Sequence, residues 1–131
     1  MQADDIKALS DVRLGHAEEC LETAKMVMDI GDYKCAANRS YYAVFHAMRA
    51  VLAYDHIDAK KHSGIIAEFR RLYIKTNVFD KEMSDTITNL FDIRTNSDYD
   101  DFFIIVKEDV EEQVAGAEKF VLQIKQYLEN K

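Results

Sequence analysis

Hydrophobic residues recur at three- and four-residue steps along almost the whole chain, which is the spacing of helices that bury one face. The first stripe consists of Ile6, Leu9, Val12, Ala17, Leu21, Ala24 and Met28. Gly31 is suited to close this helix in a left-handed conformation, and Asp32 is suited to cap the next one. Further helices are predicted over residues 33–54 and about 60–75.

The same spacing continues in the second half of the chain. A fourth helix is predicted after Asp80, with a buried face of Met83, Ile87, Leu90 and Phe91. Residues 95–101 form a predicted polar break, and residues 102–106 a buried connector or first helical turn. The seam of the last helix is Val110, Val114, Ala117, Val121, Ile124 and Leu128. This order predicts an all-α, antiparallel up-and-down bundle of four long helices plus a shorter fifth, in one domain over residues 1–131.

Composition supports the helical prediction. The 131 residues include no proline and only four glycines, whereas all-β sandwiches and barrels need many such turn residues. The longest apolar run covers residues 102–106, far below the roughly 20 residues that cross a bilayer. We see no signal peptide and expect a cytoplasmic protein without membrane association.

Charge is unevenly distributed along the chain. The net charge of −7 argues against coating of nucleic acid by the whole surface. Residues 60–75 are nevertheless basic, and residues 98–112 contain seven carboxylates and one lysine. The basic segment is either a solvated face or a contact surface for a ligand or RNA, and both interpretations stay open.

The second predicted helix has two apolar surfaces. One carries Tyr41, Phe45, Met48 and Leu52, and the other carries Ala36, Ala43, Ala47 and Ala50. A helix that is apolar almost all round is normally buried. The alanine surface is small enough for close approach by a neighbouring helix or by a second copy of the chain.

A polar stripe lies between these two surfaces and consists of Arg39, Tyr42, His46 and Arg49. Unpaired charge is costly to bury, so these side chains either tie helices together or line a cleft. Arg94 continues the core stripe of the fourth helix, and Asp98 and Tyr99 are placed to turn back toward it.

Arg94 has two interpretations as well. It either pairs with Asp98 at the helix end or forms an anion-accepting corner with Arg39 and His46. Lys61 and His62 precede the third helix, where His62 is either solvated or binds an anion with local amides. No Glu-x-x-His, His-Glu-x-x-His or glycine-rich phosphate loop occurs, so we expect neither a metal nor a cofactor.

Three segments resemble the signature segments of the HEPN-domain family. They are residues 39–47 (RSYYAVFHA), 61–64 (KHSG) and 94–99 (RTNSDY), and the resemblance extends over about residues 5–129. It implies a helical bundle, commonly a homodimer, often encoded beside a minimal nucleotidyltransferase in a toxin–antitoxin-type pair. Catalytic members are metal-independent ribonucleases with a histidine four to six residues after an arginine. In this chain Asp98 and Tyr99 stand in that window after Arg94.

Two functional hypotheses follow. In the first, the chain binds a nucleotide or a nucleotidyltransferase partner through Tyr42, Arg49, Lys61, His62, Asp98 and Tyr99. In the second, it is an active ribonuclease toxin with Arg39, His46 and Arg94 as the catalytic residues. Histidine could then move protons near neutral pH while arginine holds the phosphate.

Overall fold

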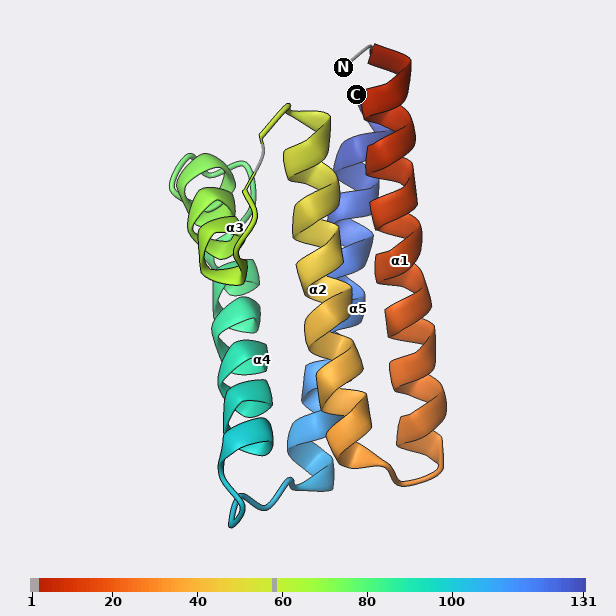
Figure 1. Ribbon diagram of the computed structural model, residues 1–131, viewed down its shortest axis with the longest axis vertical. Helices are drawn as coiled ribbons and strands as arrows, with labels where there is room; N and C mark the ends of the chain where they lie inside the picture. Colours follow the sequence, from red (N-terminus) through yellow and green to blue (C-terminus); the bar gives the residue numbers. More distant parts are fainter. Residues whose placement is uncertain (1–2, 58) are drawn as a thin grey trace.

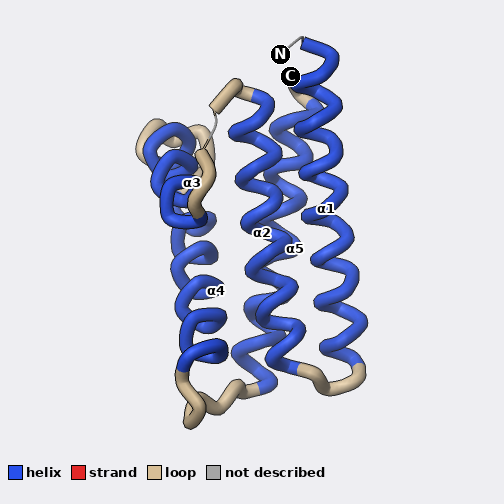
Figure 2. Tube along the Cα trace, viewed as in Figure 1, coloured by secondary structure: helices blue, strands red, loops and turns tan. Residues whose placement is uncertain are grey.

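The computed structural model describes residues 3–57 and 59–131, and within them it consists of helices and their connections (Figures 1 and 2). The helices in chain order are α1 (Ala3–Asp29), α2 (Tyr33–Tyr54), α3 (His62–Phe69), the π-helical turn η1 (Arg70–Ile74), α4 (Lys81–Tyr99) and α5 (Lys107–Glu129). The four long helices run alternately up and down, with α3 as the short fifth (Figure 1). The predicted all-α bundle is confirmed.

The turn between α1 and α2 is the one that the sequence predicts. Gly31 has φ 83°, a value open to glycine at little cost, and its N–H donates to the carbonyl of Met28 at 3.0 Å. The Asp32 side chain then accepts a hydrogen bond from the N–H of Cys35 at 3.2 Å, which caps α2. These two residues fix the antiparallel pairing of α1 with α2.

Helix α2 is the centre of the bundle. It contacts α1, α3, α4 and α5, with α1 on one side and α4 on the other (Figure 1). The alanine surface (Ala36, Ala43, Ala47 and Ala50) is fully buried within the single chain. The suggestion that this surface receives a second copy is therefore wrong, because α1 and α5 already cover the small side chains of α2.

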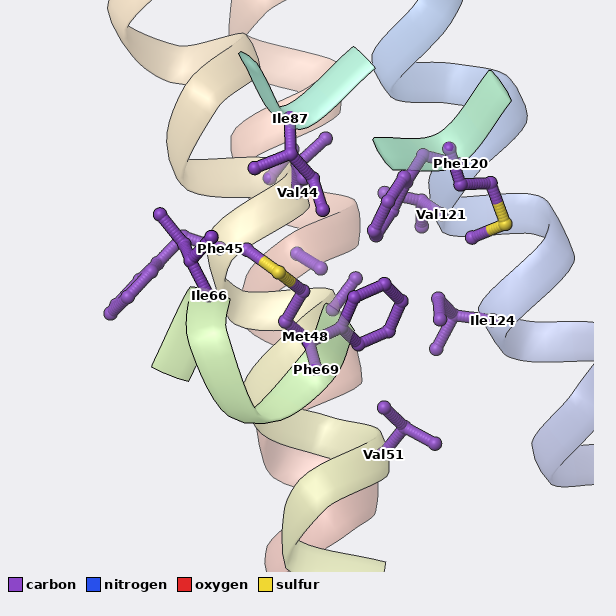
Figure 3. Packing of buried hydrophobic residues seen from close by; sticks show 14 of the residues in the cluster. Val44, Phe45, Met48, Val51, Ile66, Phe69, Ile87, Phe120, Val121 and Ile124 are labelled. Carbon is purple, nitrogen blue, oxygen red and sulfur yellow. The ribbon is translucent and has the colours of Figure 1, made fainter. Parts of the chain in front are cut away.

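The core lies where α2, α3, α4 and α5 meet. Phe69 from α3 and Phe120 from α5 have ring centroids 5.5 Å apart, and Met48 of α2 packs in the same cluster (Figure 3). Both phenylalanines are at most 1% exposed. Full burial of such a side chain stabilises the fold by about 1.5–3 kcal/mol, so this cluster fixes how α3 and α5 sit against α2.

Two residues assigned to buried faces are exposed. Val12 is 54% exposed because Ser10, not Val12, faces α2, where its hydroxyl donates to the carbonyl of Ala50 at 2.9 Å. Phe91 is 37% exposed, since it lies at the edge of α4 beside Tyr41 rather than beneath it. Both corrections reflect the narrow buried strip that a long, mostly polar helix presents to the core.

The end of α4 also differs from the prediction. Residues 95–99 are helical, so the predicted polar break begins only at Asp100. Polar residues at the surface of a helix cost little, and Arg94 supports this last turn with an ion pair to Asp98 at 3.7 Å. The connector that follows is extended and carries exposed Phe102 and Ile104, so it is neither buried nor a helical turn.

No helix in the described residues combines the length and apolar character needed to cross a bilayer.

Candidate functional site

The polar stripe is the partly exposed line of a helix that is otherwise buried. Between residues 40 and 53 of α2, every residue is buried except Tyr42, His46 and Arg49. Arg39, one turn before Tyr42, is half-buried as well. The stripe therefore lines the surface of the bundle, and its side chains are free to meet groups from α1, α3 and α4.

Arg94 of α4 joins this stripe at Tyr42. Its guanidinium donates to the Tyr42 hydroxyl at 3.2 Å and lies 5.4 Å from the centre of the Tyr42 ring and 5.0 Å from that of Tyr41. The Arg39 guanidinium lies 5.0 Å from the same Tyr42 ring and donates to the side chain of Asn38 at 2.6 Å. Two arginines from different helices thus share one aromatic ring.

His46 also lies beside Tyr42. The two ring centroids are 6.2 Å apart, and the ring of His16 from α1 meets His46 edge-on at 5.6 Å. Arg39, His46 and Arg94 thus each lie near the Tyr42 ring, at 5.0, 6.2 and 5.4 Å from its centre.

His62, the first residue of α3, completes the cluster. Its ring stacks on Phe45 with centroids 4.0 Å apart, and its Nδ1 lies 3.0 Å from the Tyr41 hydroxyl. Burial raises the pKa of Tyr41 to about 12, so this hydroxyl stays neutral. His62 is accordingly held by packing and a hydrogen bond, and the alternative of a merely solvated side chain is wrong.

Arg49 is the last basic member of the stripe. Its guanidinium lies 5.9 Å from the centre of the Phe45 ring, and its carbonyl accepts a hydrogen bond from Arg13 of α1 at 3.4 Å. We call the group formed by Arg39, Tyr42, His46, Arg49, His62 and Arg94 the basic cluster.

The basic cluster suppresses protonation of its own histidines. Burial, followed by the charges of Arg49, His16, Arg39 and His62, lowers the pKa of His46 from 6.5 to about 4. Burial and the charges of Arg94 and Arg49 also lower the pKa of His62. In both cases burial and an excess of positive charge act in the same direction, so both rings are neutral at neutral pH.

Two buried polar atoms in this cluster lack a hydrogen-bond partner. They are Nδ1 of His46 and Nε of Arg94, and the statement holds for the residues that the structure describes. The Arg94 Nε approaches Asp98 only at 3.7 Å, beyond a normal hydrogen bond. Buried polar groups are almost always satisfied, so water or a ligand is expected to supply the partner of each atom.

The remaining predicted binding residues are less closely engaged. Asp98 supplies the carboxylate that faces Arg94. Lys61 precedes α3 with an exposed side chain. Tyr99 is 81% exposed and does not turn back toward Arg94, because it occupies the last position of α4 and points into solvent.

Sequence reasoning missed the contributions of α1. His16 and Arg13 lie three residues apart, one turn of helix, and meet His46 and the backbone at Arg49. Their spacing was the only feature of the sequence that could have indicated this role, since side chains at i and i+3 lie on the same face of a helix. The pairing of α1 with α2 was needed to show which direction that is.

The arrangement suits an anion with oxygen acceptors. Guanidinium groups bind phosphate through paired hydrogen bonds, and exposed aromatic rings pack against bases. A mainly apolar groove of about 380 Å³ adjoins the basic cluster, lined by Ser63, Ile66, Ala67, Arg70, Ile87, Thr88, Phe91 and Asp92. Ser63 follows His62 in sequence and the Phe91 ring lies 6.0 Å from that of Tyr41, so the two features are neighbours.

The fold and the basic cluster define an all-α bundle with a cationic, aromatic-lined surface on its central helix. The model of the HEPN domain family matches residues 11–127, and the chain belongs to that family.

Several known proteins are similar to this chain. A Thermotoga maritima protein named "UPF0332 protein" is 32% identical over 87% of this chain and 86% of its own length. A Methanocaldococcus jannaschii protein named "Putative toxin MJ0142" is 34% identical over 88% of this chain and 78% of its own length.

A solved structure agrees with the fold. The crystal structure of ST0689, an archaeal HEPN homologue, superposes with a TM-score of 0.64 at 18% identity and covers 90% of this chain and 96% of that one. At this identity the likeness concerns the fold alone.

Proposed function

We propose that this HEPN module binds the phosphate groups of RNA or a nucleotide at the basic cluster, as one half of a toxin–antitoxin-type pair. The observation that carries the proposal is the meeting of Arg39 and Arg94 on the Tyr42 ring, beside two buried polar atoms without partners among the described residues. A phosphate bound there would accept from both guanidinium groups and restore charge balance in the cluster.

Two further facts support a toxin-type module that binds anions at one local patch. Two relatives from Methanocaldococcus jannaschii are named putative toxins, at 34% and 31% identity. The net charge of −7 disfavours nucleic-acid binding by the surface as a whole, so binding would be confined to a local cationic patch.

Fluorescence anisotropy with a labelled single-stranded RNA and a labelled ATP analogue tests phosphate binding. We expect Arg94→Ala and Arg39→Ala each to weaken binding by about tenfold, as loss of a charged hydrogen bond predicts. Arg71→Ala is the matched control, because Arg71 is exposed and pairs with Glu68. Equal affinity in all three variants, with unchanged circular dichroism, would show that the basic cluster is structural.

RNA cleavage without a metal is the second candidate function, and the neutral state of His46 favours it. A neutral imidazole can accept the 2′-hydroxyl proton as the 2′-oxygen attacks phosphorus and the bond to the 5′-oxygen breaks. Arg39 and Arg94 would stabilise the charge on the phosphorane. The 5′-oxygen needs a proton, and the Tyr42 hydroxyl is a candidate donor, since the Tyr42 ring lies 6.2 Å from that of His46.

A cleavage assay in EDTA decides between the two candidates. If the chain is a ribonuclease, the wild type should cleave RNA, and the His46→Gln variant should bind RNA without cleaving it. If the chain is only a binding module, neither protein should cleave RNA. Purification of the His46→Gln protein in parallel excludes contaminating ribonuclease, since a contaminant would cleave in both samples.

The partners are part of this proposal. The family resemblance suggests a homodimer and a minimal nucleotidyltransferase encoded nearby. Sedimentation equilibrium of the chain alone, and then with the product of the neighbouring gene, tests both.

A further inference from the structure

The α4–α5 connector (residues 100–106) exposes apolar side chains at the end of the bundle opposite the chain termini (Figure 1). Phe102 is 92% exposed, Ile104 is 81% exposed and Val106 is 46% exposed. Tyr99, at the end of α4, adds another exposed ring. Contiguous exposed apolar side chains of this size on a small domain are typical of an interaction surface.

After a turn at residues 101–102 the connector ends in extended backbone, and its exposed and packed side chains alternate. Val106 has φ −94° and ψ 134°, and residues 103–106 lie outside any helix. Phe102, Ile104 and Val106 point outward, whereas Ile105 packs on the buried cluster that includes Ala24 and Val110. One face of the segment is thus anchored to the bundle while the other is open.

The backbone of the connector has free hydrogen-bonding groups. Phe102 and Phe103 donate their N–H groups to Asp100. The N–H groups of Ile104, Ile105 and Val106 have no partner within the described part of the chain. An extended segment rich in phenylalanine and β-branched residues with unpaired backbone groups can accept an added strand.

Charge determines which strand fits. Acidic residues gather at both ends of the connector: Asp98, Asp100 and Asp101 at its start, and Glu108, Asp109, Glu111 and Glu112 after it. The one cation among them is Lys107, which pairs with Glu111 at 3.8 Å. Antiparallel pairing of two copies would place Asp100 and Asp101 of one against Glu108 and Asp109 of the other. That arrangement opposes like charges, and nucleic acid is repelled for the same reason.

We propose that the connector is a docking edge for another protein, which adds an extended strand with apolar residues on one face and lysine or arginine at both ends. The strand would pair with the backbone of residues 103–106 and cover Phe102 and Ile104, while its basic ends meet the flanking carboxylates. The proposal is independent of anion binding at the basic cluster, since it uses none of the cluster residues.

A designed peptide tests the docking edge. The probe is fluorescein-labelled KKVTVTVKK, titrated with the full chain at low salt and followed by anisotropy. We expect saturable binding that weakens as salt rises, and at least tenfold weaker binding of the acid-ended peptide EEVTVTVEE. Failure of KKVTVTVKK to bind, or equal affinity for both peptides, overturns the proposal.

Two variants locate the binding. Ile104→Pro removes one backbone N–H of the connector. The double variant Phe102→Ser/Ile104→Ser removes the apolar contacts instead, and it provides the test if the proline variant does not fold. Each should weaken KKVTVTVKK binding at least tenfold, while Leu122→Ser, an exposed position on α5, leaves it unchanged. Arg39→Ala, at a residue that contacts Asn38 and Tyr42, should also leave it unchanged, and this separates the test from that of the proposed function.

Sedimentation would reveal whether a second copy of the chain, and not another protein, occupies the connector. Should the wild-type chain sediment as a dimer that Ile104→Pro converts to a monomer, the edge pairs with a second copy and the proposal is wrong. Unchanged peptide affinity in both connector variants would likewise contradict it.

Discussion

Tyr42 is the residue through which the polar stripe of α2 meets α4. Its ring lies against Arg39 of its own helix, its hydroxyl accepts from Arg94 of α4, and its ring neighbours that of His46. The hydroxyl therefore orients Arg94, whose Nε has no hydrogen-bond partner among the described residues.

Tyr42→Phe removes that hydroxyl and keeps the ring. The free energy of unfolding should fall by about 1 kcal/mol, the net value of one hydrogen bond to a partly buried group. Urea titration followed by circular dichroism measures the difference. Tyr99→Phe is the matched control, because the Tyr99 side chain is 81% exposed, and an equal loss in both variants would contradict this role of the Tyr42 hydroxyl.

His46 makes stability depend on pH. Its pKa is about 4 in the folded chain and has the ordinary histidine value of 6.5 in the unfolded chain, so the unfolded chain binds a proton in a range where the folded chain does not. Stability should therefore be complete above about pH 6.5 and fall as the pH drops toward 4. Melting temperatures between pH 7.5 and 5 should decline less in His46→Gln than in the wild type.

Most carboxylates stay ionised above pH 5, so they contribute little to the change in stability measured in this range. His62, whose pKa is also lowered, is present in both proteins and cancels in the difference. Parallel melting curves for the two proteins would show that His46 is protonated equally in folded and unfolded states.

Sequence predicted most of the basic cluster because helical spacing alone puts Arg39, Tyr42, His46 and Arg49 on one line. It could not fix the distance from that line to Arg94, which depends on how α4 packs on α2. His16 was missed for the same reason, since its contact with His46 joins residues thirty positions apart in two helices.

At the scale of elements, the beginning of α4 is fixed by a side-chain cap. The Asp80 side chain accepts from the N–H of Met83 at 3.3 Å, at the position after which the sequence predicts the helix. Asp80→Ala should lower the free energy of unfolding by about 1 kcal/mol. Asp85→Ala, at an exposed position of the same helix, is the control for loss of one negative charge.

Chemical denaturation of both variants measures this effect. The loss should be larger for Asp80→Ala because only that variant leaves a backbone N–H without its side-chain acceptor. Equal stability would mean that water replaces the cap at no cost.

The other end of α4 marks where sequence reasoning failed. Turn-forming residues such as Asn96 and Ser97 favoured a break, yet Asn96 accepts the backbone hydrogen bond from Asp100 that closes the helix. The apolar run at residues 102–106 suggested burial, but the bundle is already filled by residues such as Leu90 and Val110. Hydrophobicity alone cannot show that the core has no room left.

At the scale of the whole molecule, a net charge of −7 surrounds a local cluster of arginines. Long-range repulsion of nucleic acid and short-range attraction at the basic cluster then act against each other. The number of phosphates bound is consequently set by the cluster and not by the total surface.

Salt dependence of RNA binding measures that number. Each phosphate neutralised on a single strand contributes about −0.7 to the slope of log affinity against log salt concentration. Contacts from Arg39, Arg49 and Arg94 predict a slope near −2, to within about half a unit. Arg94→Ala should reduce its magnitude by about 0.7, whereas Arg71→Ala, which alters a surface pair with Glu68, should not change it. A slope steeper than about −3 would require more phosphate contacts than the basic cluster has arginines, and would place RNA on the basic segment of residues 60–75 as well.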